Sequence, residues 1–197
     1  MQVKCPKLLL VSTIFCCSLA HCIAAPSLTA GVVFNDLNGV GHRPLDPGDK
    51  VASVLLFYWH DCPVCNSYAS EINRICASYT NFAFYIVQVD PDLTPAAARE
   101  HKREYDLRAP VLLDPDHRLV KLAKATVTPE VVVLGRTGHT LYSGRIDDLY
   151  AAPGKRRSAA TQGDLREALA AISAGQPAKH RKTQAIGCLI QERMLKW

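Results

Sequence analysis

Two cysteines separated by two residues, Cys62 and Cys65, are the residues best suited to chemistry. They follow an apolar run and begin a segment with helical spacing, so Cys62 is expected at the N-terminus of a helix. Unpaired backbone N–H groups and the helix dipole favour a thiolate at that position. Cys65 lies about one turn further on, where it can close a disulfide with Cys62 or resolve a mixed disulfide. The spacing therefore predicts thiol–disulfide exchange.

A structural disulfide and half of a zinc site are the main alternatives to a redox-active pair. A zinc site needs two further ligands, and neither a second Cys-x-x-Cys nor a His-x-x-x-His follows. The histidines nearest in sequence are isolated from one another: His60, His101, His117 and His139. The strand before the motif and the helix after it favour redox chemistry.

The elements that must position the motif alternate between apolar strands and amphipathic helices. Strands are predicted at 51–58, 82–89, 111–113, 130–134 and 140–145, with a short hairpin near 32–38. Helices are predicted at 62–79, 95–105 and 165–174, with a helical turn at 119–123. Thr94 and Asp164 are expected to cap the second and third helices. This order predicts an α/β fold, and its closing hairpin predicts a mixed sheet.

Composition and charge exclude several classes of protein. The chain has 197 residues, 48% hydrophobic and 21% charged, which is typical of one globular domain. The formal net charge of +5 falls to +3 without Lys4 and Lys7, too little to indicate a nucleic-acid partner. Two short basic runs, 155–157 and 179–182, are interpreted as solvated surface.

The first 25 residues have the pattern of a secretory signal peptide. Lys4 and Lys7 precede an apolar stretch from 8 to 20, and small residues follow at Ala24 and Ala25. The stretch is too short to cross a hydrocarbon core of about 30 Å. We therefore expect cleavage and export to a periplasmic or secreted location, with no stable membrane insertion afterwards. The pattern favours cleavage over lipid anchoring at Cys22.

Cleavage would leave Cys62, Cys65, Cys76 and Cys188 in an oxidising compartment. In a continuous helix Cys76 lies about 16 Å beyond Cys65, too far for a disulfide with either cysteine of the motif. Its simplest role is that of a small buried hydrophobe. Cys188 follows a polar linker with an extended reach of over about 30 Å. It is expected to be an alternative resolving thiol for the motif, a partner of Cys76, a free thiol, or a cysteine bonded to another chain.

Two segments resemble those of thioredoxin-like redoxins, the group that includes alkyl hydroperoxide reductase and thiol-specific antioxidant proteins. Phe57–Cys65, which reads FYWHDCPVC, resembles their active-site segment, and Val127–Glu130, which reads VTPE, resembles their cis-proline loop. The resemblance extends from about Val32 to Asp147 and implies a thioredoxin-like three-layer fold, with a mixed central sheet flanked by helices. It also implies Cys62 as nucleophile, Cys65 as resolving thiol and Pro129 as the cis-proline. Trp59, Thr128 and Pro129 would then bind the substrate.

Departures from these relatives leave other functions open. Peroxiredoxins carry threonine or serine three residues before the peroxidatic cysteine and proline seven before it, where this chain has Trp59 and Leu55. Thioredoxins place tryptophan directly before the first cysteine, where this chain has Asp61, whose carboxylate opposes thiolate formation. A peroxiredoxin-like thiol peroxidase and a copper carrier of the same fold are therefore alternatives.

The sequence thus predicts an exported bacterial thiol–disulfide oxidoreductase that needs no cofactor and no metal. Its expected organisation is a signal peptide at 1–25, a redoxin domain at 26–175 and a basic tail with Cys188 at 176–197. Its expected partners are protein disulfides or thiols and a redox partner protein.

Overall fold

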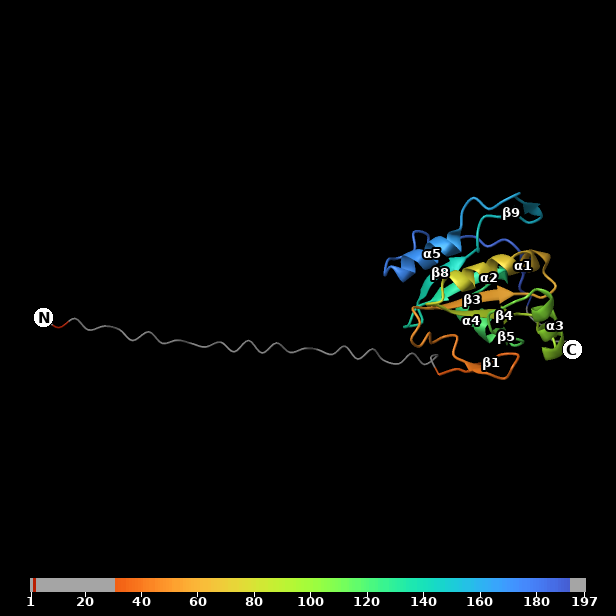
Figure 1. The fold of residues 1–197 in the computed structure, drawn as a ribbon, viewed down its shortest axis with the longest axis horizontal. Coiled ribbons are helices and arrows are strands. Elements are labelled where there is room, and N and C mark those ends of the chain that lie inside the picture. The colour runs from red at the N-terminus through yellow and green to blue at the C-terminus, as the bar shows by residue number, and fades with distance from the viewer. Residues whose placement is uncertain (1, 3–30, 192–197) are drawn as a thin grey trace.

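A five-stranded mixed sheet forms the centre of the molecule (Figure 1). The computed structural model describes residue 2 and residues 31–191. The strand order is β5-β4-β3-β7-β8. β3 (Ser53–Tyr58), β4 (Ala83–Gln88) and β5 (Val111–Leu113) are parallel, β7 (Glu130–Leu134) is antiparallel to β3, and β8 (Thr140–Gly144) is antiparallel to β7. The predicted α/β fold with a mixed sheet is confirmed.

Helices cover both faces of the sheet and complete three layers (Figure 1). One face carries α1 (Pro63–Ser67), α2 (Ala69–Ser78), α3 (Pro95–Glu104) and α5 (Asp164–Ser173). The other carries α4 (Arg118–Ala123) and the hairpin of β1 (Phe34–Asn35) and β2 (Gly41–His42).

The central strand β3 is buried on both sides, which explains its nearly continuous apolar sequence. Leu56 and Tyr58 point into the core beneath α2 and α5, whereas Leu55 and Phe57 point into the core beneath α4. This alternation follows from the two-residue period of a strand. The strand therefore holds its C-terminal end, and the motif that follows, in a fixed position.

Two predicted helix features are wrong in detail. The helix predicted at 62–79 is divided at Tyr68, whose backbone N–H bonds to the Cys65 carbonyl, three residues back rather than four. Gly163 is the N-cap of α5, and Asp164 is its first residue. The Asp164 carboxylate binds the Arg145 guanidinium at 2.8 Å instead of capping the helix. Thr94 does cap α3, because its hydroxyl oxygen accepts a bond from the Ala97 N–H.

Four short strands were not predicted. β9 (Tyr150–Ala152) and β10 (Lys155–Arg156) form a hairpin, and β6 (Val127–Thr128) pairs with β11 (Cys188–Leu189). The segment after α5 is therefore more than a linker, since Ala178 is buried in the core and β11 lies against the domain. Short edge pairings of this kind depend on which segments meet in space, which local propensity does not encode.

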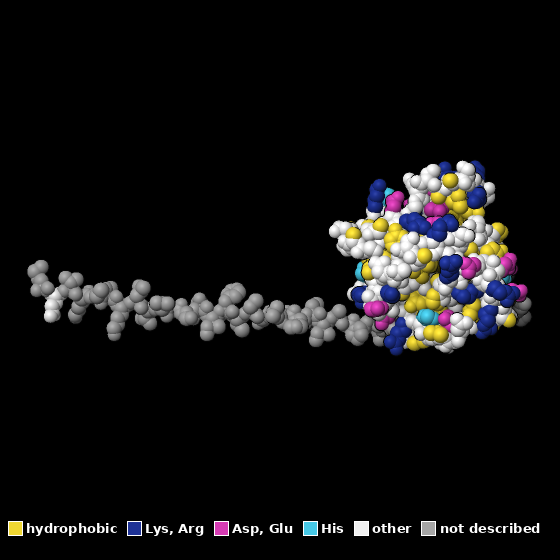
Figure 2. Space-filling model, in the orientation of Figure 1, with side chains coloured by type: hydrophobic (Ala, Val, Ile, Leu, Met, Phe, Trp, Pro, Cys, Tyr) yellow, Lys and Arg dark blue, Asp and Glu magenta, His cyan; other side chains and the backbone are white. Residues whose placement is uncertain are grey.

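The predicted signal peptide at 1–25 and Cys22 lie outside the described residues, apart from Gln2. Within the described part of the chain, no helix has the length and apolar character that a membrane span requires. On the face shown in Figure 2, Lys and Arg side chains are interspersed with Asp and Glu side chains. The charges on that face therefore form no extended surface of one sign.

Candidate active site

Cys62 lies at the N-cap of α1, four residues after the end of β3. Its backbone is extended, with φ −82° and ψ 113°, and its N–H bonds to the Trp59 carbonyl at 3.0 Å. Pro63 occupies the first helical position, where a missing N–H costs little. Cys65 lies one turn further along, and both side chains are buried. The motif therefore begins a helix at the end of a buried strand, as predicted.

A loop from the other half of the sheet lies against Cys62. The Thr128–Pro129 peptide bond is cis, as the resemblance implied. The Cys62 sulfur is 3.5 Å from the Thr128 carbonyl oxygen, although 66 residues separate them in sequence. The fold therefore brings together Cys62, Thr128 and Pro129, three of the predicted site residues. Trp59 contributes its carbonyl to the turn before Cys62, and its side chain is partly buried against the core.

Glu130 holds this loop in place through hydrogen bonds, a role that was not predicted from the sequence. One carboxylate oxygen accepts hydrogen bonds from the Thr126 N–H at 2.8 Å, the Thr126 hydroxyl at 3.3 Å and the Val127 N–H at 3.4 Å. The residue is 9% exposed, so these charge-assisted bonds are sheltered from water. A glutamate directly after the Thr-Pro pair was the only signal in the sequence.

The two cysteines of the motif have opposite pKa shifts. The pKa of Cys62 falls to about 5, first because the Cys65 side chain hydrogen-bonds to its thiolate, then because Cys188 and the backbone N–H groups of Cys65 and Val64 do so. Burial opposes this effect. The pKa of Cys65 is raised, first by burial and then by its hydrogen bond to Cys62 and the charge on Cys62. Cys62 is therefore the thiolate at neutral pH, and Cys65 is the thiol.

Asp61 does not prevent this ionisation. Its side chain is 72% exposed and lies 3.3 Å from His60 Nε2, where water screens its charge from Cys62. The hydrogen bonds to the thiolate therefore outweigh the neighbouring carboxylate.

A buried polar network lies behind the motif. The Tyr58 hydroxyl donates to the Asn66 side-chain oxygen at 2.9 Å, and His101 Nε2 lies 3.0 Å from the same oxygen. The Asn66 amide donates in turn to the His60 carbonyl at 2.8 Å. Tyr58 is fully buried and His101 is 6% exposed. The network ties β3, α1 and α3 together, and no spacing in the sequence indicated that these residues meet.

Cys188 lies beside Cys62, with 2.7 Å between the two sulfur atoms. Its pKa is raised to about 12, first by burial and then by its hydrogen bond to Cys62 and the charge on Cys62. Cys76 lies elsewhere, on α2, where burial raises its pKa to about 12. None of the four cysteines Cys62, Cys65, Cys76 and Cys188 forms a disulfide in the structure. Of the sequence alternatives for Cys188, the structure therefore has the contact with the motif and not the bond to Cys76.

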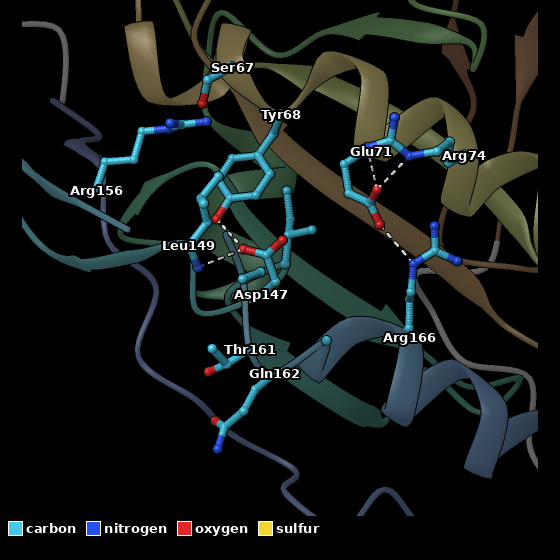
Figure 3. Close-up of a pocket in the computed structure, with 13 residues that line it drawn as sticks. Ser67, Tyr68, Glu71, Arg74, Asp147, Leu149, Arg156, Thr161, Gln162 and Arg166 are labelled. Atoms are coloured by element: carbon cyan, nitrogen blue, oxygen red, sulfur yellow. Dashed lines mark hydrogen bonds and ion pairs between the residues drawn. The ribbon is translucent and has the colours of Figure 1, made fainter. Parts of the chain in front are cut away.

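Among the described residues, no group of three or more His, Cys, Asp or Glu side chains could hold a metal ion. A surface hollow is lined by residues of α1, α2, α5 and the segment between β8 and α5, and its carboxylates, Glu71 and Asp147, have hydrogen-bond partners (Figure 3). Glu71 binds both Arg74 and Arg166 at 2.7 Å, and no cysteine lines the hollow.

Comparison with known proteins adds sequence and fold relatives. A family model described as the AhpC/TSA family matches residues 44–142. The thiol-disulfide oxidoreductase YkuV of Bacillus subtilis (strain 168) is 26% identical over 107 residues, which cover 52% of this chain and 71% of that protein. These matches agree with the oxidoreductase class predicted from the dithiol motif.

Two solved structures have the same fold. An uncharacterized conserved protein from Geobacillus kaustophilus matches with a TM-score of 0.71 and 23% identity, covering 82% of this chain and 88% of that one. A secreted disulfide oxidoreductase of Mycobacterium tuberculosis, homologous to E. coli DsbE, matches with a TM-score of 0.55 and 19% identity, covering 73% and 97%. The family match runs from before β3 into β8 and spans half of the chain. The protein therefore belongs to the AhpC/TSA family and has the thioredoxin-like fold predicted for it.

Proposed function

We propose that this protein is an exported thiol–disulfide oxidoreductase in which Cys62 is the nucleophile and Cys65 the resolving thiol. The observation that carries the proposal is the pair of buried cysteines one turn apart at the start of α1, with the cis Thr128–Pro129 peptide beside Cys62. The opposite pKa shifts of the two cysteines agree with these roles. The thiolate is the reactive form of cysteine, and at neutral pH a pKa of about 5 keeps Cys62 in that form.

The first half-reaction forms a mixed disulfide. The Cys62 thiolate attacks one sulfur of a substrate disulfide, and a Cys62–substrate bond replaces the substrate bond. The other substrate sulfur leaves with the electron pair and takes up a proton. Cys62 is then neutral, so it no longer raises the pKa of Cys65 through its charge. Loss of a proton from Cys65 becomes easier at the moment when its thiolate is needed.

In the second half-reaction the Cys65 thiolate attacks the Cys62 sulfur. A Cys62–Cys65 disulfide forms, and the second substrate thiol leaves, so two electrons pass from the protein to the substrate. Run in reverse, the same steps oxidise a substrate dithiol. The natural substrates on this proposal are protein disulfides or thiols, and a separate redox partner restores the starting state.

The backbone beside Pro129 supports the binding of an extended substrate segment. Thr128 and Pro129 are buried beside Cys62, and β6 ends at Thr128. An extended peptide paired with β6 would present its sulfur to Cys62, with Trp59 supporting the turn on the other side. This mode of recognition is addition of a strand to a sheet edge, and the substrate strand would take the place that β11 has in the structure.

The proposal is tested with scrambled disulfide-bonded protein and with insulin as substrates. Wild type should exchange both sets of disulfides, and Cys62→Ser should have no activity. Because Cys188 also lies beside Cys62, the mixed disulfide at Cys62 should accumulate when Cys65→Ser is combined with Cys188→Ser. Cys76→Ser is the matched control and should retain wild-type rates. Activity that survives in Cys62→Ser would contradict the proposal.

Peroxide consumption by the same variants tests the peroxidase alternative. Trp59 stands where peroxiredoxins carry a hydroxyl side chain, and Leu55 is buried in the core beneath α4. We therefore expect little turnover of hydrogen peroxide. Rapid, Cys62-dependent peroxide turnover without exchange of protein disulfides would favour the peroxidase.

Export is supported by the pattern of residues 1–25 and is tested directly. The full-length gene product should be recovered from the periplasm or the medium with a new N-terminus close to residue 26. A chain recovered with residues 1–25 intact would contradict cleavage, and a lipid-modified Cys22 would favour anchoring.

A further inference from the structure

The segment that carries Cys188 lies along the edge of β6, next to Cys62. β11 pairs antiparallel with β6, with Cys188 opposite Thr128 and Leu189 opposite Val127. The Ile190 N–H bonds to the Thr126 carbonyl at 3.0 Å, and the Thr128 hydroxyl donates to the Cys188 carbonyl at 3.4 Å. Among the described strands, β6 has β11 as its one partner. The tail therefore takes the place that an added substrate strand would take.

The register of this pairing delivers a sulfur atom to the nucleophile. Cys188 faces Thr128, whose carbonyl oxygen is itself 3.5 Å from the Cys62 sulfur. The Cys188 sulfur reaches 2.7 Å from that of Cys62. Because successive side chains of a strand point to opposite sides, a slip of one residue would turn this sulfur away from Cys62.

Gly187 makes this register possible. A Cβ on Gly187 would overlap the Thr128 carbonyl oxygen, lie 2.7 Å from the Thr128 carbonyl carbon and lie 3.2 Å from Pro129 Cδ. Two of these atoms belong to a backbone that β6 and Glu130 hold in place, so the loop cannot easily move aside. The space along β6 beside Thr128 and Pro129 in which the tail lies, which we call the groove, therefore has room only for a residue without a side chain directly before the cysteine.

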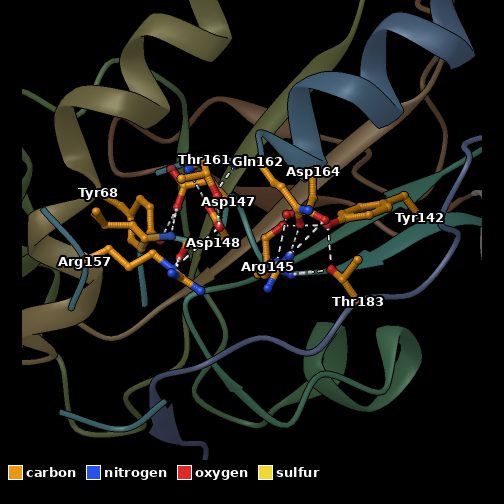
Figure 4. A network of polar contacts seen from close by, with 11 residues as sticks. Tyr68, Tyr142, Arg145, Asp147, Asp148, Arg157, Thr161, Gln162, Asp164 and Thr183 are labelled. Atoms are coloured by element: carbon orange, nitrogen blue, oxygen red, sulfur yellow. Dashed lines mark hydrogen bonds and ion pairs between the residues drawn. The ribbon is translucent and has the colours of Figure 1, made fainter. Parts of the chain in front are cut away.

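A second contact holds the tail close to the groove. The Thr183 N–H bonds to the Ser143 carbonyl at 3.0 Å. The Thr183 hydroxyl oxygen lies 2.8 Å from the Tyr142 hydroxyl and accepts a hydrogen bond from the Arg145 backbone N–H at 3.1 Å (Figure 4). Gly144 permits the approach, because a Cβ there would lie 2.8 Å from the Thr183 carbonyl carbon. With Thr183 fixed at β8, Cys188 remains at a high effective concentration beside Cys62.

The tail is only partly buried where it pairs with β6. Cys188 and Gly187 are half-buried, and Leu189 is 69% exposed. Two residue pairs and a few hydrogen bonds hold β11, so an external strand can compete with it once no covalent bond is present.

We propose that the groove beside Thr128 and Pro129 is a binding site for extended peptides with glycine directly before the reactive cysteine, and that residues 187–190 are its built-in occupant. This inference rests on the proposed function and names the substrate class of the same site. When no substrate is present, the tail fills the groove and Cys188 becomes the disulfide partner of Cys62.

The covalent step needs no external oxidant once Cys62 and Cys65 are oxidised. The Cys188 thiolate attacks the Cys62 sulfur, a Cys62–Cys188 bond forms, and the Cys62–Cys65 bond breaks. The electron pair leaves on Cys65, which takes the proton that Cys188 released. One disulfide replaces another, so there is no net oxidation. The reverse attack by Cys65 frees the tail and restores the dithiol pair.

Disulfide mapping of the oxidised full chain tests the built-in occupant. Wild type should contain an intramolecular Cys62–Cys188 bond, and Gly187→Ala should lower its ratio to the Cys62–Cys65 bond by at least about tenfold. Gln184→Ala, an exposed change in the same segment, should leave the ratio unchanged. The absence of the Cys62–Cys188 bond in wild type, its persistence in Gly187→Ala, or its formation between two chains would overturn the inference.

Peptide disulfides test the substrate class on Gly187→Ala, in which the groove is vacated. The probes are the symmetrical disulfides of Ala-Ile-Gly-Cys-Leu-Ile and Ala-Ile-Ala-Cys-Leu-Ile. The glycine peptide should form a mixed disulfide with Cys62 at least about tenfold faster, and equal rates would overturn the selectivity. Failure of the proposed function is distinguishable, because then even insulin would show no Cys62-dependent exchange.

Discussion

Cys188 lies directly opposite Thr128 in the pairing of β11 with β6, and its sulfur is 2.7 Å from that of Cys62. Cys62 therefore has two neighbouring cysteines, Cys65 and Cys188; its own pKa is lowered, and theirs are raised. Only one of the three gives up its proton near neutral pH. The pH dependence of the protein should reveal this asymmetry.

The redox midpoint should fall by about 30 mV per pH unit between pH 6 and pH 8, since reduction by two electrons takes up one proton. Cys62 remains a thiolate in this range because its pKa is about 5, whereas the second cysteine is protonated. Below pH 5 Cys62 is protonated as well, so reduction takes up two protons and the slope should approach about 59 mV per pH unit. The midpoint is measured against glutathione by mass spectrometry. A slope near 59 mV throughout would contradict the lowered pKa.

The same shift makes the stability of the reduced protein depend on pH. The folded-state pKa of Cys62, about 5, lies below that of an unfolded thiol, so the unfolded state binds more protons in between. The free energy of unfolding should therefore rise with pH from about 5 to about 8.5 and be lost as the pH falls through 5. Urea unfolding under reducing conditions measures this, and Cys62→Ser should remove that part of the dependence.

Replacing Glu130 should loosen the loop that faces Cys62. Glu130→Ala leaves the N–H groups of Thr126 and Val127 without their acceptor and should cost about 1–3 kcal/mol of stability. The rate of disulfide exchange should also fall, because Thr128 is no longer held beside Cys62. Glu130→Gln keeps one acceptor oxygen and should lose less. Glu100→Ala, at an exposed helix position, is the control and should change stability by less than about 0.5 kcal/mol.

Asn66 should contribute more to stability than other asparagines of the chain. Asn66→Ala removes the shared acceptor of the Tyr58 hydroxyl and His101, both buried, and should cost about 2–3 kcal/mol. Asn73→Ala removes hydrogen bonds at an exposed edge, where water replaces them, and should cost less. Urea unfolding compares the two variants. Equal losses would show that the buried network has no special role.

Thr183 should control the mobility of the tail. Thr183→Val removes the hydroxyl that bonds to Tyr142 and to the Arg145 N–H, at a cost of about 1–2 kcal/mol. Backbone amides at 188–190 should then exchange hydrogen faster, whereas those of α2 should not. Thr183→Ser retains the hydroxyl and should resemble wild type. If the amides of β11 exchange no faster in Thr183→Val, the pairing with β6 is sufficient by itself to hold the tail.

The sequence by itself determined the five strands of the central sheet, most of the helices and the order in which they occur. The apolar run of β3, the Cys-Pro-Val-Cys motif after it and the Thr94-Pro95 helix start are local patterns, because each depends on residues close together in the chain. The dithiol could therefore be assigned to a helix N-terminus without a structure. The break of the helix at Tyr68 and the true cap of α5 could not, because Tyr68 and Asp164 bond to distant partners, Asp147 and Arg145.

The tertiary structure decided what surrounds the dithiol. Cys62 and Cys188 are 126 residues apart, and linker length alone left Cys188 free to meet Cys62 or Cys76. What selected Cys62 is a short strand pairing that needs β6 in place and no side chain at Gly187. The support from Glu130, Asn66 and His101 likewise arises from contacts made only after folding. Local pattern determines which element a residue joins, whereas the choice of its partners requires the packed fold.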